Sequence, residues 1–151
     1  MMGYHSDIAI AFAFARREQI DEVLAVYRLH PLVQAHDLAE CWEVHDWDGV
    51  WGLTYQDINV KWYDSYEAVQ GIKHMENLVE SFAKERGTDV GGTDENGKQE
   101  LVHLFPYAFR SIRVGEEIED VEIYTADTGN VALVDELIDR LNIQREIETA
   151  F

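Results

Sequence analysis

The chain has one cysteine, two prolines and no apolar run approaching the length of a membrane span. A single cysteine, Cys41, allows neither an intramolecular disulfide nor a Cys-x-x-Cys metal site, and we expect its thiol to be buried and inert. A spanning helix needs roughly 20 consecutive apolar residues. The apolar stretch 8–14 has neither a basic flank nor a cleavage-like site, as a signal peptide would. These absences predict a cytoplasmic protein without a membrane partner.

Basic residues are also scarce, since 12 Lys and Arg stand against 30 Asp and Glu, a net charge of −18. Such a field repels phosphate backbones and anionic lipids, so direct binding to nucleic acid or to a membrane surface is disfavoured. It attracts basic proteins instead. Two alternatives stay open, namely that the acidity only keeps the protein soluble and that it is an adaptation to high salt.

Motifs of common catalytic sites are missing. The sequence contains no Gly-x-Gly-x-x-Gly, no Gly-x-x-x-x-Gly-Lys-Ser/Thr and no Gly-x-Ser-x-Gly. The histidines after the N-terminus form no His-x-x-x-His pair, which leaves His45 with Asp46 and Asp48 as the nearest cluster for zinc. We therefore expect no catalytic residue, no metal and no cofactor, and a protein that is not an enzyme.

The segment that organises the chain is a predicted helix over residues 65–85. Its apolar residues recur at spacings of four, three, four and three, which gives one buried face: Ala68, Ile72, Met75, Val79 and Phe82. Asp64, three residues before Glu67, predicts a capping arrangement at its start. Gly87 predicts its end.

The rest of the chain predicts one α+β domain over residues 1–151, because 46% of residues are hydrophobic and the length suits a single core. Bulky residues alternate with alanines over 7–14, which indicates a central strand buried on both faces. Asp48-Gly49 predicts a hairpin turn. We expect a mostly antiparallel sheet, with two main helices and a short third helix packed mainly on one face. The further segments are a helix over 16–29, a helical turn within 32–40, hairpin strands 41–47 and 50–55, a third strand run 58–62, a flexible loop 88–99, strands 107–114 and 122–125, and a helix over 131–140. Residues 141–148 fit either an edge strand or a continuation of that helix.

An acidic run provides the first candidate binding site. Five carboxylates fall within seven residues: Glu116, Glu117, Glu119, Asp120 and Glu122. Side chains on one face of a strand repeat at about 6 to 7 Å, close to the spacing of successive phosphates, so this run could form a face that a basic protein binds. A solvated acidic turn is the alternative. The run lacks the layout of a calcium loop.

Three blocks of the chain resemble a group of small bacteriophage and prophage proteins. The blocks are residues 2–7 (Met-Gly-Tyr-His-Ser-Asp), residues 60–66 (Val-Lys-Trp-Tyr-Asp-Ser-Tyr) and residues 109–117 with 120–122 behind them. That group typically begins Met-Gly-Tyr-Arg-Ser, and His5 stands here where Arg is usual. The resemblance implies a viral origin and assigns no catalytic residues.

The same blocks suggest a second candidate site. We expect their polar residues to gather at one end of the sheet, as either a small polar pocket or a structural ion-pair network: Tyr4, His5, Lys61, Tyr63, Asp64, Arg113 and Glu116.

The function we expect is that of a phage protein in the host cytoplasm that binds a host protein through the acidic face. The partner would be basic or nucleic-acid-binding, and DNA mimicry that inhibits a host defence or nucleic-acid-processing system is one form of such binding. The alternatives are a small ligand-binding domain or enzyme that uses the polar pocket, and a phage structural or assembly factor.

Overall fold

The computed structural model describes residues 5–93, 95–117 and 119–149 of the chain. Its main sheet has five strands in the order β2-β3-β1-β6-β7, and every neighbouring pair is antiparallel. The strands of this sheet are β1 (Ser6–Phe14), β2 (Glu43–Asp46), β3 (Trp51–Val60), β6 (Tyr107–Gly115) and β7 (Val121–Asp127). The α+β class and the mostly antiparallel sheet predicted from the sequence are confirmed.

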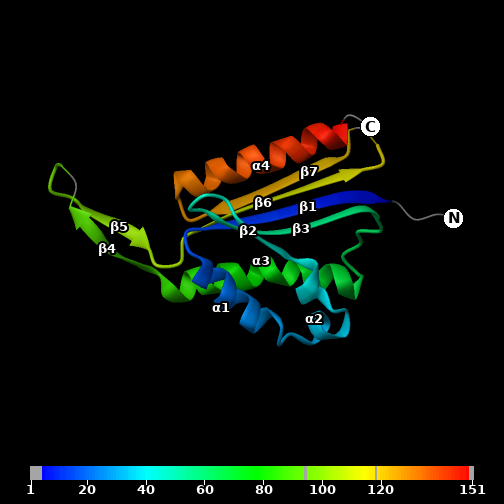
Figure 1. Cartoon of the computed structure of the whole chain (residues 1–151), viewed down its shortest axis with the longest axis horizontal. Helices are drawn as coiled ribbons and strands as arrows, with labels where there is room; N and C mark the ends of the chain where they lie inside the picture. Colours follow the sequence, from blue (N-terminus) through cyan, green and yellow to red (C-terminus); the bar gives the residue numbers. More distant parts are fainter. Residues whose placement is uncertain (1–4, 94, 118, 150–151) are drawn as a thin grey trace.

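Helices cover both faces of this sheet (Figure 1). The helices α1 (Arg17–Tyr27), α2 (Pro31–Ala35) and α3 (Glu67–Arg86) lie on one face, and α4 (Val131–Thr149) lies alone on the other. No helix in the described ranges is long and apolar enough to cross a membrane.

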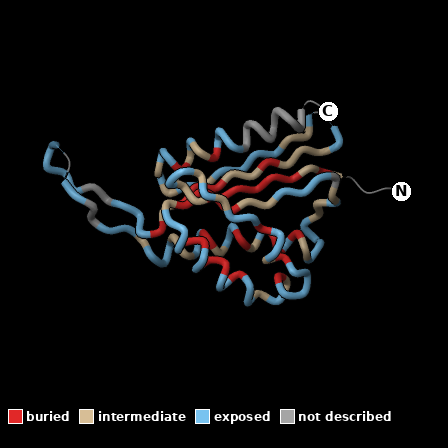
Figure 2. Tube along the Cα trace, viewed as in Figure 1, coloured by how far each residue is buried: buried red, intermediate tan, exposed pale blue. Residues whose placement is uncertain are grey.

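The alternation in β1 explains this arrangement. Strand β1 is the middle strand, paired with β3 and β6, and nearly all of it is buried (Figure 2). Its bulky residues join the main core with α1, α2 and α3, whereas its alanines pack with Leu133 and Leu137 of α4. The predicted central strand is confirmed, because each face of β1 supplies a different apolar layer.

The hairpin between β2 and β3 forms as predicted. Asp48 (φ 52°) and Gly49 (φ 92°) take the positive φ values that the turn requires, and the Trp47 amide donates to the Val50 carbonyl over 2.8 Å. Strand β3 continues through most of the run 58–62, which the sequence predicts as a third strand. Cys41 ends a 3-10 turn (Leu38–Cys41) and is exposed, so the predicted burial of its thiol is wrong.

Helix α3 has the predicted buried stripe and ends at Gly87 (φ 68°), but its predicted cap is wrong. The N-cap is Tyr66, which makes no side-chain capping bond. Asp64 lies two residues earlier, and its carboxylate pairs with Lys73 on the second turn of the helix. An ion pair therefore takes the carboxylate that local sequence assigned to the cap.

The predicted loop 88–99 is instead part of a second, two-stranded sheet. Strands β4 (Thr88–Thr93) and β5 (Gln99–His103) pair antiparallel with an irregularity between Val90 and Gly92. This hairpin projects away from the body of the molecule (Figure 1). The prediction failed because two of the glycines that suggest a loop serve the hairpin itself: Gly92 lies at that irregularity, and Gly97 takes the positive φ (79°) of the turn.

Helix α4 is longer than the helix predicted over 131–140. It continues to Thr149, so the helical alternative for 141–148 is confirmed and the edge strand is wrong. The sheet already ends at β7 on this side, and α4 runs across the alanine-rich face.

Candidate functional site

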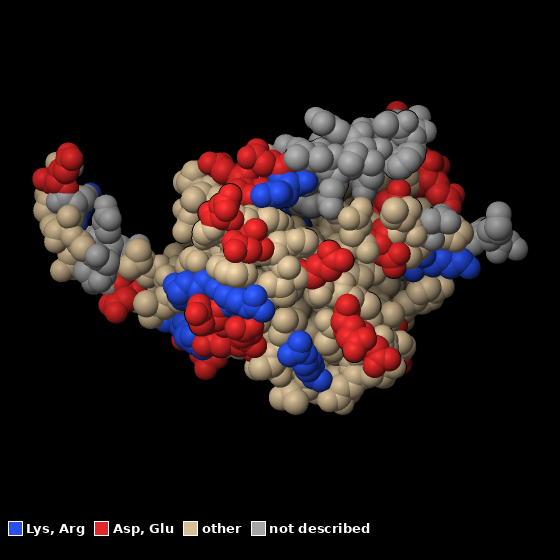
Figure 3. Space-filling view, in the orientation of Figure 1, with Lys and Arg blue, Asp and Glu red and all other residues tan. Residues whose placement is uncertain are grey.

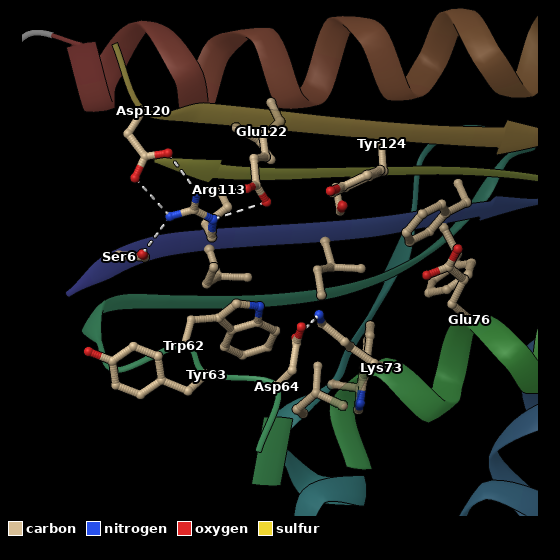
Figure 4. Close-up of a pocket in the computed structure, with 18 residues that line it drawn as sticks. Ser6, Trp62, Tyr63, Asp64, Lys73, Glu76, Arg113, Asp120, Glu122 and Tyr124 are labelled. Atoms are coloured by element: carbon tan, nitrogen blue, oxygen red, sulfur yellow. Dashed lines mark hydrogen bonds and ion pairs between the residues drawn. The ribbon is translucent and has the colours of Figure 1, made fainter. Parts of the chain in front are cut away.

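A cleft of about 690 Å³ opens between the sheet and α3. Its floor is apolar and comes from the bulky face of the two central strands, with Ile8, Ile10 and Phe12 on β1 and Phe109 on β6. Trp42 and Trp62 add aromatic walls. Charged and hydroxyl side chains lie around this floor (Figure 4). An apolar cavity with a few polar groups is the usual form of a small-molecule site.

The fold explains why the cleft is open. Helices α1 to α3 pack on the middle of the sheet, and β7 is its edge. Tyr124 on β7 lines the cleft and is still 60% exposed. The β7 edge therefore forms an open side of the cleft, opposite α3 (Figure 4).

Arg113 on β6 is the most heavily bonded side chain at the cleft. Its Nη1 and Nη2 donate to the two carboxylate oxygens of Asp120 over 3.2 and 2.7 Å. Its Nε and Nη2 contact the two oxygens of Glu122 at 3.2 and 2.9 Å. Nη1 also donates to the Ser6 hydroxyl over 3.0 Å. The register explains this grouping, because Arg113 lies directly opposite Glu122 on β7.

Asp120 and Glu122 each bind the Arg113 guanidinium through both carboxylate oxygens. Their hydrogen bonds raise the pKa of Arg113, with Glu122 the larger cause, and the same contact lowers the pKa of the Glu122 carboxyl. Only 16% of the Arg113 side chain is exposed. The positive charge of Arg113 is thus fully compensated by the two carboxylates, and its donors already have acceptors.

A second ion pair lies across the cleft from Arg113. Lys73 on α3 contacts Asp64 at 2.5 Å, which lowers the pKa of the Asp64 carboxyl. The loop that carries Asp64 also contributes Trp62 and Tyr63 to the cleft, and the Trp62 ring packs against Tyr55. This loop is held to the helix by Gln70, whose amide donates to the Asp64 carbonyl over 3.0 Å.

The structure brings together part of the predicted polar pocket. Tyr63, Asp64 and Arg113 line the same cleft. His5 lies beyond it, with its backbone amide and Nδ1 at 2.8 and 3.1 Å from the Glu116 carboxylate. Lys61 is exposed and is not among the lining residues, and Tyr4 lies outside the described residues.

The acidic run forms the connection between β6 and β7. Glu116, Asp120 and Glu122 accept hydrogen bonds from His5 or Arg113, and hydrogen bonding from His5 lowers the pKa of the Glu116 carboxyl. Glu117 and Glu119 are exposed. Glu116, Asp120 and Glu122 are therefore among the carboxylates bound to groups of this chain. On the face that Figure 3 shows, carboxylates lie in separate patches. Binding of a partner by the acidic run stays a prediction.

Sequence reasoning missed Glu76 and Tyr124, which both line the cleft. Glu76 is four residues after the buried Ile72 and so lies on nearly the same side of α3. That spacing was available in the sequence. Tyr124 could not be found in this way, since its place depends on the pairing of β7 with β6.

A second hollow, of about 740 Å³, lies over β2 and β3 near α4, and its lining is mostly polar. His45 there contacts the Thr54 hydroxyl at 2.7 Å, and Arg140 pairs with Glu136 and lies over the Trp47 ring. Within the described ranges, no three His, Cys, Asp or Glu side chains are grouped as metal ligands. Because the lining of the second hollow is mostly polar, the cleft between the sheet and α3, with its apolar and aromatic floor, is the better candidate for an organic ligand.

The fold and the cleft together define the class of protein: an α+β protein with an antiparallel sheet and, between that sheet and α3, a cavity that is partly apolar and partly polar. Comparison with protein-family models, with curated proteins and with solved structures gives no match.

Proposed function

We propose that this protein binds a small organic molecule in the cleft between the sheet and α3. The observation that carries the proposal is the cavity itself, about 690 Å³ with an apolar, aromatic floor and charged side chains at its margin. Arg113, whose side chain is 16% exposed, is held by two carboxylates, which preorganises that side of the margin; the Lys73–Asp64 pair on the other side is exposed. A cavity shaped in advance loses less entropy when it binds.

Nile red, a neutral apolar dye, tests the proposal. Binding should give a saturable, blue-shifted fluorescence increase, and Ser111→Trp should abolish it, because Ser111 is a half-buried residue of the cleft lining. Thr125→Trp is the matched control, since it adds the same side chain at an exposed position outside the lining. No saturable signal, or equal binding by both variants, would contradict the proposal. Native mass spectrometry of the purified protein would then show whether it carries a ligand.

A second candidate is the binding of a basic host protein, in keeping with the resemblance to phage proteins. The observation in its favour is the net charge of −18, together with the fact that many Lys and Arg side chains are already paired with carboxylates of the same chain. Within the described ranges, at least six cations pair with carboxylates of this chain: Arg17, Lys73, Lys84, Arg86, Arg113 and Arg140. The outward field is therefore strongly acidic, as in a DNA mimic that blocks a defence or nucleic-acid-processing protein.

A pull-down from host lysate separates the two candidates. Capture through the acidic surface should weaken with salt, be competed by duplex DNA, and fall in the double variant Glu117→Lys, Glu119→Lys, while Ser111→Trp retains it. If the amount of captured protein does not change with duplex DNA, with salt or with the charge reversal, binding through the acidic surface is refuted, while the proposed ligand binding is unaffected.

A further inference from the structure

The charges around the cleft are unequal. Its lining carries four carboxylates and two cations, hence a net charge of −2 in a chain whose total is −18. Lys73 pairs with Asp64, and Arg113 is shared by Asp120 and Glu122. Glu76 is the remaining carboxylate. It accepts no hydrogen bond and forms no ion pair within the part of the chain that the structure describes.

Glu76 is placed to meet a ligand. It rises from α3 toward the sheet, beside the apolar floor (Figure 4). Glu76 is exposed by its overall accessibility, yet partial loss of solvent at its carboxyl is the main cause that raises its pKa; the nearby Glu80 adds to the effect, and Lys73 opposes it. A positive group of a ligand brought to this carboxylate would stabilise its charged form.

The aromatic side chains that line the cleft also favour a positively charged group. Six aromatic side chains line the cleft: Phe12, Trp42, Trp62, Tyr63, Phe109 and Tyr124. Aromatic faces attract organic cations as well as apolar bodies. An anionic ligand would have to displace a carboxylate from Arg113 or Lys73, because both already have partners.

We infer that the ligand of this cleft is an organic cation, with an apolar or aromatic body among the rings and a protonated amine or quaternary ammonium at Glu76. This inference rests on the proposed function and names its ligand class. The acidic field of the whole molecule would also raise the local concentration of such a cation and speed its encounter with the cleft.

Three indole compounds of nearly equal size test the charge preference: tryptamine (cation), tryptophol (neutral) and indole-3-acetate (anion). Isothermal titration calorimetry should show tryptamine binding about tenfold or more tightly than tryptophol, with indole-3-acetate weakest, because the charged contact at Glu76 is available only to the amine. In Glu76→Gln, tryptamine should fall to the affinity of tryptophol. Glu85→Gln, an exposed residue of the same helix outside the cleft lining, should leave all three affinities unchanged.

The outcomes separate the ligand class from the proposed function. Equal binding of the three compounds, or a tryptamine preference that survives Glu76→Gln, would overturn the inference, and loss of all binding in Ser111→Trp would then keep the cleft as a site for apolar bodies. Binding untouched by Ser111→Trp would overturn both. No binding of any compound at millimolar concentration also overturns the inference, and with a negative Nile red test it removes the proposed function as well.

Discussion

Arg113 is the residue whose loss should be most costly at the cleft margin. Among the described residues, Arg113 is the one hydrogen-bond partner of the Glu122 carboxylate, so Arg113→Ala leaves that carboxylate near Asp120 without it. We expect the free energy of unfolding to fall by about 1 to 3 kcal/mol, measured by urea denaturation. Lys84→Ala is the control, since its pair with Glu80 is well exposed and should contribute at most about 0.5 kcal/mol. Equal effects of the two substitutions would show that the Arg113 network is no stronger than a surface pair.

His74 gives stability a dependence on pH. Its ring lies 4.1 Å from that of His30 and stacks on Tyr27, and burial, with a smaller effect of His30, lowers its pKa. The folded protein thus takes up this proton less readily than the unfolded chain, in which histidine has a pKa of about 6.5. The stability associated with neutral His74 is full above that pH and is lost as pH falls below it. Urea denaturation at pH 7, 6 and 5 should show this loss.

His74→Phe keeps a ring in the stack and removes the titrating group, so the loss of stability between pH 7 and 5 should shrink. His103→Phe, at an exposed position of β5, should retain the wild-type slope. A His74→Phe slope equal to that of the wild type would mean that other groups cause the dependence.

At the scale of elements, the β4–β5 hairpin should be dispensable for the fold. None of its described residues belongs to either apolar core, and Thr88 and His103 are directly opposite partners at its base. Joining Thr88 to His103 through Asn-Gly suits a two-residue turn. We expect this shortened chain to keep its free energy of unfolding within about 1 kcal/mol of the full chain, since little apolar surface is exposed by the change.

Phe105→Ala provides a comparison for the hairpin deletion, because it is a substitution that should be costly. Phe105 lies just after the hairpin, is 1% exposed and contacts Phe14 and Phe82, so its truncation should cost about 3 to 5 kcal/mol. A hairpin deletion as costly as Phe105→Ala would show that the hairpin supports the body.

Elements with strong periodicity could be predicted from the sequence, and their exact roles could not. The two-faced strand β1 and the stripe of α3 follow from local patterns, because burial imposes those patterns. The Asp64 cap failed since a competing cation, Lys73, lies nine residues away and becomes a neighbour only once the helix has formed. The cleft depends on how far α3 sits from the sheet, which no local pattern encodes. The sequence predicts that Arg113, Tyr63 and Asp64 share one site, and they do line the same cleft. Glu76 was missed because its place in the lining depends on the position of α3 relative to the sheet.

For the whole molecule, the excess negative charge should make stability depend on salt. Raising sodium chloride from about 0.02 to 0.5 M should increase Tm by a few degrees, because screening relieves repulsion among the carboxylates more than it weakens the internal ion pairs. The double variant Glu117→Lys, Glu119→Lys has a net charge of −14 and should respond less. A lower Tm at high salt would mean that the internal pairs dominate the balance.

The alternation of alanine with bulky residues in β1 has a consequence for how this protein could change over time. Substitutions at Ile8 and Ile10 alter the cleft floor, while the alanines on the other face keep α4 in place. The side that lines the cleft and the side that packs against α4 are thus carried by one strand yet can vary separately. Single mutations at alternate positions of β1 could therefore enlarge or reduce the cleft over generations, with the scaffold inherited unchanged.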